Sequence, residues 1–397
     1  MKYISILSMV LMILITLVSI SFGQWLNHGL NDIKAYEIKV NGDHMYAATV
    51  DGVWHKLQGD PPSAWTAVGM QGQAVSALLI IDNYNMVIGL RFGDHAIWRT
   101  SDAGATWLPS DSGFHVSIIN EIDMADYQPD TIFAAGVGIA RSVDGGYTWT
   151  TVHAADGASA FVEIDPNNNH SIWCGGENII FQPLLLTSPN LGEDWYSIPI
   201  NGGGDNACYD VAIRPSQSEQ IWVAMEGIIQ FSNNGGLSWM PQLVNNFYLY
   251  SIEVDPVRSN YLYSTGGVST GHMLTLFYTH DAGQPWDSTI ENSYSANWAH
   301  DIEIVSAGDH NTVYLATDHG IFSFNDSKEV FCGDSDGDGI GPNVADLVFL
   351  VNYIFKGGPS PDPIYLSDVT GNGDGINVAD LVYMVNYLFK GGPQPEC

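Results

Sequence analysis

The stretch Ser142-Val-Asp144-Gly-Gly146-Tyr-Thr-Trp149 recurs along the chain in the form Ser/Thr-x-Asp/Asn-x-Gly-x-x-Trp. Its five copies are spaced by 42, 46, 44 and 47 residues and end at Trp107, Trp149, Trp195, Trp239 and Trp286. A period in the forties indicates an array of supersecondary units. We interpret the box itself as structural, because its polar side chains can satisfy turn backbone groups, its Gly permits a positive φ and its Trp can pack between sheets.

Each box follows a two-strand pattern, in which a β-rich run, a Gly-containing turn and a second run succeed one another. Seven such units lie near Met45, Met86, Thr131, Ile172, Ile221, Leu262 and Val313. A further strand, such as Phe161–Pro166, opens most units. About four strands per repeat are typical of a propeller blade.

The two ends of the array complement each other. The first unit has a degenerate box ending at Trp65, the last unit has none, and Trp25 lies 40 residues before Trp65. We expect the Trp25 segment to supply the outer strand of the last blade, because a closed ring leaves no open sheet edge. The sequence thus predicts an all-β, seven-bladed propeller over residues 24–326. Six blades with unpaired ends is the alternative.

The boxes resemble the Asp boxes of sialidase-type (BNR-repeat) propellers, a group that also contains sortilin-like proteins, photosystem II assembly factors and certain xyloglucanases. The resemblance covers most of residues 24–326. It implies the propeller fold but no particular activity, because one fold hosts many functions.

Composition narrows the classes of partner. The chain has 12 Lys and Arg against 44 Asp and Glu, a formal net charge of -32. Such a surface repels phosphate backbones, which excludes nucleic-acid binding. Lys2, the apolar run 4–20 and the small-x-small site Ser21-Phe-Gly23 predict a signal peptide over residues 1–23. An uncleaved anchor is the alternative. No later run is long enough for a membrane span, so we expect a secreted, extracellular protein.

A catalytic site is harder to identify. The sialidase resemblance would require an arginine triad and a Phe-Arg-Ile-Pro motif, and that motif does not occur. The propeller's arginines mostly sit beside repeat turns: Arg91, Arg99, Arg141, Arg214 and Arg258. A glycosidase would need paired carboxylates. Five glutamates fall at roughly corresponding places in the first strands of five repeats and are expected to line the channel, as a solvated edge or as a site for a cation or a basic partner: Glu37, Glu121, Glu163, Glu253 and Glu303.

The loops between repeats offer candidate ligand-binding residues, because such loops usually carry binding. The segments 246–250 and 293–300 are rich in aromatic rings, which suit carbohydrate or peptide ligands. Packing of the rings between blades is the alternative. The candidates are Tyr248, Tyr250, Tyr294, Trp298 and His300.

A second domain is expected after a short linker at residues 327–331. Residues 334–359 match 368–393 at an offset of 34. The copies begin Asp334-Ser-Asp336-Gly-Asp338 and Asp368-Val-Thr370-Gly-Asn372, and alternating oxygen donors followed by Gly are what a calcium loop requires. Apolar residues at helical spacing then predict helices over 344–355 and 378–389.

These loop–helix pairs resemble a type I dockerin, which implies an all-α, EF-hand-like domain over residues 332–397 that binds two Ca²⁺ ions and a cohesin-type partner. The resemblance assigns as ligands Asp334, Asp336, Asp338 and Asp346 in the first copy, and Asp368, Asn372 and Asp380, with Thr370 as a weaker one, in the second. Ile340 and Asp374 are further candidates at the less certain positions of the loops. The closing acid is thirteenth rather than twelfth, which leaves the seventh and ninth positions open. Cohesin contacts are carried over to Val344-Ala345 and Val378-Ala379, identical in both copies.

Four cysteines allow three pairings. Cys332 and Cys397 flank the duplicated unit, whose ends should meet if its halves are related by pseudo-twofold symmetry, so we expect a disulfide between them. Cys174 and Cys208 are then either a second pair or two buried free thiols.

The sequence favours a secreted, non-catalytic propeller that binds a glycan or a protein. Its dockerin-like domain would attach it to a cohesin-type partner, in solution or at a cell surface. The alternative is a secreted glycoside hydrolase carried by the same domain. A surface structural protein is the third hypothesis.

Overall fold

The computed structural model describes residues 25–113, 118–125, 128–154, 157–201, 207–268, 273–291, 296, 298–307, 310–327, 332–336, 341–361, 364–395 and 397. The expected signal peptide and residues 328–331 of the expected linker lie outside this set. The chain divides into two compact units. One comprises Trp25–Ser306 and Thr312–Phe324, and the other has Asn325–Cys397 as its main part. Among the described residues, no helix is long and apolar enough to cross a membrane.

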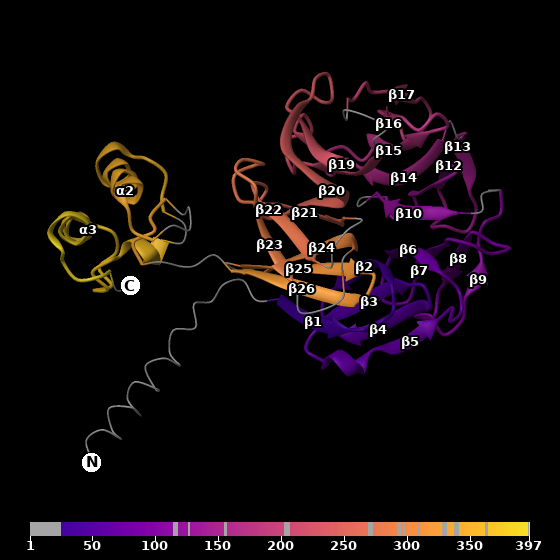
Figure 1. Cartoon of the computed structure of the whole chain (residues 1–397), viewed down its shortest axis with the longest axis horizontal. Helices are drawn as coiled ribbons and strands as arrows, with labels where there is room; N and C mark the ends of the chain where they lie inside the picture. Colours follow the sequence, from indigo (N-terminus) through magenta and orange to yellow (C-terminus); the bar gives the residue numbers. More distant parts are fainter. Residues whose placement is uncertain are drawn as a thin grey trace, which may run out of the picture. The chain divides into compact units, whose positions relative to one another are not determined.

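The first unit is a propeller, in which antiparallel sheets form a ring (Figure 1). The centre of such a ring is a channel. Four sheets consist of four consecutive strands each. They are β2 Ala35–Asn41, β3 His44–Thr49, β4 Gly52–Leu57 and β5 Thr66–Gly69; β6 Val75–Ile80, β7 Met86–Leu90, β8 Ile97–Thr100 and β9 Leu108–Pro109; β10 Ile119–Met124, β11 Ile132–Gly136, β12 Gly138–Ser142 and β13 Thr150–His153; β14 Gly157–Ile164, β15 Ile172–Asn178, β16 Pro183–Ser188 and β17 Tyr196–Ser197. A 3₁₀ turn, η1 Pro62–Ala64, precedes β5.

The expectation of seven blades is wrong, because the described residues form six sheets. The fifth and sixth predicted units share one six-stranded sheet. Its strands are β18 Cys208–Ile213, β19 Ile221–Ser232, β20 Met240–Val254, β21 Leu262–Gly267, β22 Leu274–Thr279 and β23 Asp287–Glu291. The cause is β20, which runs for 15 residues without a break. Its first half pairs with β19 and its second half with β21, so two sequence repeats are joined into one sheet.

The remaining sheet closes the ring. It contains β1 Trp25–Gly29, β24 Ala299–Ala307, β25 His310–Thr317 and β26 Gly320–Ser327, in the order β1-β26-β25-β24. Trp25 lies opposite Phe324 in the antiparallel pairing of β1 with β26. The prediction that the Trp25 segment completes the last unit is confirmed. The ring therefore has closed ends, unlike the six-bladed alternative with unpaired ones.

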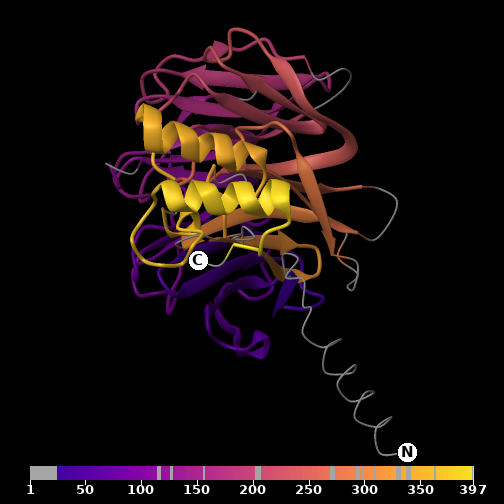
Figure 2. The ribbon, with the colours of Figure 1, turned by 90° about the vertical axis from the view of Figure 1, so that its left-hand side faces the viewer.

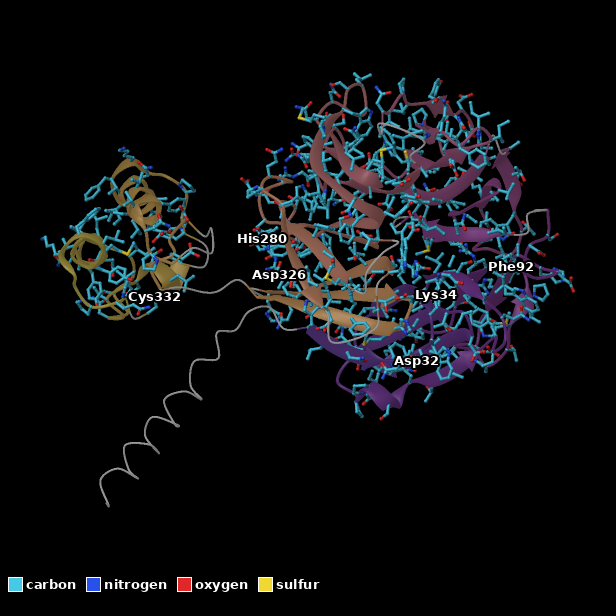
Figure 3. All side chains as sticks on the ribbon, viewed as in Figure 1. Asp32, Lys34, Phe92, His280, Asp326 and Cys332 are labelled. Atoms are coloured by element: carbon cyan, nitrogen blue, oxygen red, sulfur yellow. A yellow bond between two sulfur atoms is a disulfide. The ribbon has the colours of Figure 1, made fainter. Side chains whose placement is uncertain are left out.

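The recurring box is a turn, as predicted. In the copy that ends at Trp149, the Ser142 Oγ accepts a hydrogen bond from the Gly146 N–H (2.8 Å) and the Asp144 Oδ1 accepts one from the Thr148 N–H (2.9 Å). The Trp149 ring is buried in a cluster with residues of two neighbouring sheets, including Val87 and Ile132. Similar apolar clusters lie between other neighbouring sheets, where side chains fill the space (Figure 3). Each box thus holds one sheet against the next.

The second unit contains the helices α2 Val344–Lys356 and α3 Val378–Lys390, which lie side by side (Figure 2), and a short 3₁₀ helix, η2 Ile364–Ser367. Both predicted helices are present. Each starts with a reciprocal capping box and ends at a glycine in the left-handed conformation. Leu350, Val369 and Met384 form a small buried core.

The described structure also answers the question of cysteine pairing. Cys332 and Cys397 form the predicted disulfide within the second unit. Cys174 and Cys208 are free and buried in two different apolar clusters of the propeller. Of the two readings left open by the sequence, the free-thiol one is therefore correct.

Candidate functional site

A row of β-bulges builds the mouth of the channel. On six channel-lining strand segments the register shifts near the start of the strand, so that one residue is skipped in the pairing. The skipped residues are Tyr36, Ser76, Asn120, Ala160, Tyr209 and Tyr250. A bulge re-aims a side chain relative to its strand. All six residues line one cavity of about 570 Å³.

Glycines opposite two of the bulges permit this geometry. Gly266 pairs with Leu249, next to the bulge at Tyr250, and a Cβ on Gly266 would overlap the Tyr248 carbonyl oxygen. Gly136 pairs with Ile119, next to the bulge at Asn120, and a Cβ there would overlap the Ile118 carbonyl oxygen. The two glycines therefore let the backbone beside each bulge approach the neighbouring strand closely.

The cavity has an aromatic wall. The rings of Tyr250 and Trp298 are stacked, with centroids 5.6 Å apart, and the His300 ring is also stacked with Tyr250, at 5.8 Å. Tyr209 meets Tyr250 edge-on at 4.8 Å. Tyr209 lies on β18, Tyr250 on β20 and His300 on β24, and Trp298 just precedes β24. Such a wall offers large, rigid contact area to an apolar ligand face.

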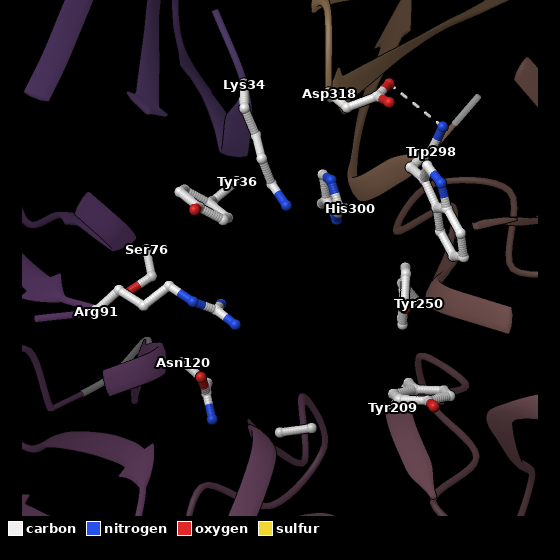
Figure 4. A pocket seen from close by; sticks show the side chains of 11 residues that line it. Lys34, Tyr36, Ser76, Arg91, Asn120, Tyr209, Tyr250, Trp298, His300 and Asp318 are labelled. Carbon is white, nitrogen blue, oxygen red and sulfur yellow. Dashed lines mark hydrogen bonds between the residues drawn. The ribbon is translucent and has the colours of Figure 1, made fainter. Parts of the chain in front are cut away.

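The opposite side of the same cavity is cationic (Figure 4). Lys34 precedes β2 and Arg91 follows β7. The Lys34 Nζ lies 4.7 Å and the Arg91 Cζ 5.5 Å from the centroid of the Tyr36 ring. Asp318 completes the lining, and its Oδ1 accepts a hydrogen bond from the Trp298 N–H (3.3 Å).

His300 is a polar group placed between the two sides. Burial, and secondarily the charges of Lys34 and Arg91, lower the pKa of His300 to about 3, so the ring is neutral near pH 7. Its Nε2 is shielded from solvent and has no hydrogen-bond partner within the described part of the chain.

Below the mouth, the channel narrows to a cavity of about 80 Å³ with an acidic lining, which includes Glu37, Glu121, Asp210 and Asp301. Each of these carboxylates crosses to an adjacent channel-lining strand. Glu121 accepts a hydrogen bond from the Val162 N–H (3.0 Å), Asp210 from the Ile252 N–H (2.8 Å) and Asp301 from the Ile38 N–H (2.9 Å). Glu37 does the same for the Leu78 N–H (2.5 Å). The acids thus satisfy backbone donors on strand edges that face the channel.

Burial raises the pKa values of the carboxyl groups in the channel. Burial raises the pKa of Glu37, Asp210 and Glu303 to about 7 each, against the opposing effects of Lys39 on both glutamates and of backbone N–H groups on Asp210. Burial also raises the pKa of Glu121, Glu163, Glu253 and Asp301. For Lys39, burial alone would lower the pKa, but the carboxylates around it, Glu37 foremost, raise it. The Lys39 Nζ lies 3.0 Å from the Glu37 Oε1.

The five glutamates expected at corresponding places occupy two levels of the channel. Glu37 and Glu121 immediately follow the bulge residues Tyr36 and Asn120. Glu163, Glu253 and Glu303 lie two residues further along their strands and line a separate cavity of about 280 Å³. These glutamates were expected to form a solvated edge, but most of them connect neighbouring strands instead.

Of the expected ligand-binding residues, Tyr250, Trp298 and His300 line the mouth cavity. Tyr248 is not part of the described lining but borders it, since its ring centroid lies 5.8 Å from that of Trp298. Tyr294 lies outside the described residues. Whether these residues bind a ligand stays a prediction.

Sequence reasoning missed most of the cavity lining, including Lys34, Tyr36, Arg91, Asn120 and Tyr209. One signal was available: the residue before Glu37 and Glu121 corresponds in the repeats to Tyr209, Tyr250 and His300. Arg91 had no such signal. It is the one arginine among the described lining residues, whereas Arg99 and Arg141 hydrogen-bond to turn carbonyls, as their repeat positions suggested.

The first loop of the second unit gathers acids. Asp334, Asp336 and Asp346 each offer an oxygen within 4.8 Å of the others. Asp346 is also part of the helix cap, because its Oδ2 accepts a hydrogen bond from the Asn343 N–H (2.9 Å). Asp338 and Ile340, two further expected ligands, lie outside the described residues. Three converging carboxylates fit the oxygen donor set of Ca²⁺.

The second loop gathers fewer donors. The Thr370 Oγ1 donates to Asp380 Oδ1 (2.9 Å) and lies 3.2 Å from Asp368 Oδ1, so these three expected ligands are together. The Asn372 Oδ1 instead accepts a hydrogen bond from the Asp374 N–H (2.8 Å), and both residues are exposed. The second loop thus brings together two carboxylates and a hydroxyl.

Comparison with known proteins identifies the fold but no family. No family model matches the sequence, and no curated protein matches it significantly. The GH74 xyloglucanase from Xanthomonas campestris has a TM-score of 0.60 at 16% identity, over 76% of this chain and 53% of that chain. The chain therefore spans about half the length of that enzyme.

Two further similar structures are not named as enzymes. YCF48 bound to D1 peptide has a TM-score of 0.54 at 14% identity, over 76% of this chain and 96% of that chain. The extracellular domain of BT4673 from B. thetaiotaomicron has a TM-score of 0.58 at 14% identity, over 76% of this chain and 40% of that chain. At such identities the likeness shows the propeller fold alone, which occurs both with and without catalysis.

Proposed function

We propose that this chain is a secreted binding protein whose propeller takes a carbohydrate in the mouth of its channel without catalysing a reaction. The observation that carries the proposal is the cavity of about 570 Å³ with its stacked Tyr250 and Trp298 rings. Its volume falls in the range of ligand pockets, roughly 300–1,000 Å³.

The chemistry of the lining supports a sugar. The apolar face of a pyranose ring can stack on Tyr250 and Trp298, while its hydroxyls reach polar groups at the floor. The Asn120 Nδ2 is committed to the Ser159 carbonyl (2.8 Å), which leaves its side-chain carbonyl oxygen as an acceptor toward the cavity.

A glycan array tests the proposal, with Tyr250→Ala as the site variant. Loss of one stacked ring should weaken glycan binding by about tenfold or more. Tyr84→Ala is the matched control, because Tyr84 is exposed and does not line the described cavity. A thermal melt of each variant verifies folding. Binding to a peptide panel but to no glycan would overturn the proposal.

The glycoside hydrolase alternative has one observation in its favour. The cavity of about 280 Å³ is lined by Glu163, Glu253 and Glu303, and burial raises the pKa of all three. A carboxyl kept protonated near neutral pH can act as a general acid beside a second carboxylate. Release of reducing sugar from a polysaccharide, abolished by Glu253→Gln and unaffected by Tyr84→Ala, would replace the binding function with hydrolysis.

The second unit is proposed to be a calcium-dependent, dockerin-like domain that attaches the propeller to a cohesin-type partner outside the cell. The convergence of Asp334, Asp336 and Asp346 supports the metal site. The expected partner residues Val344, Ala345, Val378 and Ala379 are all exposed at the starts of the two helices. Further exposed apolar residues follow on each helix, namely Val348 and Phe355, and Val382 and Phe389. A duplicated apolar face suits docking onto another protein.

Calcium removal tests this part of the proposal. Ca²⁺ should raise the midpoint of one thermal transition and leave a second, propeller transition unchanged, because metal binding is coupled to folding in a small domain. Asp336→Asn should reduce that shift, whereas Asp94→Asn, at an exposed position in the propeller, should not. Identical calorimetric traces with calcium and with a chelator would refute the calcium site. A cohesin panel in pull-down format would then test the partner.

A further inference from the structure

Two cations meet at the mouth cavity of a strongly acidic protein. The whole chain has 12 Lys and Arg against 44 Asp and Glu, yet Lys34 and Arg91 both line this cavity. They lie against the same Tyr36 ring. Within the described part of the chain, neither forms an ion pair, and Asp318 is the one acid in the described lining. Adjacent cations without an ion-pair partner repel each other unless an anion binds between them.

The electrostatics of Lys34 agree with this picture. Burial lowers the pKa of Lys34, the Arg91 charge lowers it further, and Asp318 partly offsets both effects. An anionic group between the two side chains would reverse the effect of Arg91. It would also accept hydrogen bonds from the N–H groups of both side chains. An Arg guanidinium suits a carboxylate because its N–H donors match the two carboxylate oxygens.

The position of the cations limits where the anion can bind. Lys34, Tyr36 and Arg91 project from one side of the cavity, and Trp298, Tyr250 and Tyr209 face them across it (Figure 4). Below them, Glu37, Glu121, Asp210 and Asp301 line the narrower channel. An anion would be repelled by these acids once they ionise, so it belongs at the mouth and not deeper.

We propose that the mouth cavity recognises an acidic sugar, a uronic acid residue whose carboxylate binds between Lys34 and Arg91 while its ring stacks on Tyr250 and Trp298. This inference rests on the proposed carbohydrate-binding function and adds the ligand class. The cationic side of the cavity matches the carboxylate of such a sugar, and the aromatic wall matches the apolar face of its ring. A neutral sugar would occupy the aromatic wall and leave the cations unpaired.

The test compares a short oligogalacturonate with the same oligomer after its carboxylates have been reduced to alcohols, both titrated by calorimetry into the full chain. The acidic oligomer should bind about tenfold more tightly or better, because it alone makes charge-assisted hydrogen bonds. Lys34→Gln and Arg91→Gln should each remove most of that preference. Lys390→Gln, in the last turn of α3, is the matched control for loss of one positive charge. Added salt should weaken binding of the acidic oligomer alone.

The outcomes separate this inference from the proposed function. Equal binding of both oligomers, unchanged by Lys34→Gln and Arg91→Gln, would overturn the acidic-sugar inference and leave carbohydrate binding intact. Tighter binding of a sulfated, carboxylate-free oligosaccharide would overturn the choice of a carboxylate. Failure of every neutral and acidic glycan to bind, with a thermal melt showing a folded propeller, would overturn both.

Discussion

Single residues that fall out of register shape the mouth of the channel. Tyr36, Asn120, Tyr209 and Tyr250 each occupy a bulge, and each therefore points into the cavity rather than following the alternation of its strand. Their identities differ although their positions repeat. A repeated backbone feature thus presents an asymmetric set of side chains, which is what a specific binding site requires.

Gly266→Ala tests the role of the glycines opposite the bulges. The new Cβ would overlap the Tyr248 carbonyl oxygen, so the strand pair must move apart. We expect the free energy of unfolding to fall by about 2 kcal/mol or more. Urea denaturation measures it. Gly59→Ala is the control, since no atom lies within 4 Å of a Cβ built at Gly59. Equal stability of the two variants would contradict the steric argument.

At the scale of the element, carboxylates connect adjacent channel-lining strands. Glu37 on β2 accepts the Leu78 N–H of β6, and Asp301 on β24 accepts the Ile38 N–H of β2. These contacts join strands that share no backbone ladder. Because burial raises the pKa of these acids, ionising them costs more in the folded protein than in the unfolded chain.

The pH dependence of stability follows from these raised pKa values. Burial raises the pKa of Glu37 from 4.5 to about 7. Its favourable contribution is therefore present below about pH 4.5 and is lost as the pH rises through about 7. Glu37→Gln keeps an acceptor for the Leu78 N–H but cannot ionise. We expect the variant to gain stability relative to the wild type between about pH 5 and pH 8.

Thermal melts across this pH range measure the difference between the two proteins. Glu219→Gln provides the control, because Glu219 is exposed. The comparison cancels the opposite effect of the buried His28, the pKa of which burial lowers to about 4. A difference between wild type and Glu37→Gln that stays constant with pH would refute the assignment.

At the scale of the whole propeller, closure of the ring depends on its first strand. Trp25 on β1 packs against Phe324 on β26, with ring centroids 5.4 Å apart, and the Trp25 Nε1 donates a hydrogen bond to Thr289 Oγ1 (3.2 Å). Residues almost 300 positions apart along the chain thereby share one sheet. One edge of the last sheet is therefore formed by a short N-terminal segment.

Trp25→Ala measures the contribution of this closure. Removal of a half-buried indole that bridges β1 and the last sheet should cost about 2 kcal/mol and loosen the pairing of β1 with β26. Hydrogen exchange of the β26 amides reports the pairing, and calorimetry reports the stability. The neighbouring Leu26→Ala should be nearly neutral, because Leu26 is 45% exposed. Equal effects of both variants would show that β1 does not stabilise the ring through Trp25.

Much of this architecture was predictable from the sequence, because it depends on contacts between residues close in the chain or on a strict period. The box turn closes through hydrogen bonds within eight residues, as at Ser142 and Asp144. The helices of the second unit follow from apolar spacing and caps, and the disulfide from the duplication that Cys332 and Cys397 flank. The pairing of the Trp25 segment with the last unit also followed, because the sequence of that unit contains no tryptophan box.

Two features were decided only by the tertiary structure. The number of sheets depends on whether the backbone of β20 stays extended between two repeats, and a repeat count carries no information on that continuity. The cavity depends on the convergence of Lys34, Arg91, Tyr250 and His300 from strands far apart in the chain. Lys34 and Arg91 carried no signal in their own repeats, because only closure of the ring brings them to the same point as Tyr250 and His300. The sequence alone therefore determined the repeats and the turns that hold them, and the closed ring determined which side chains share a site.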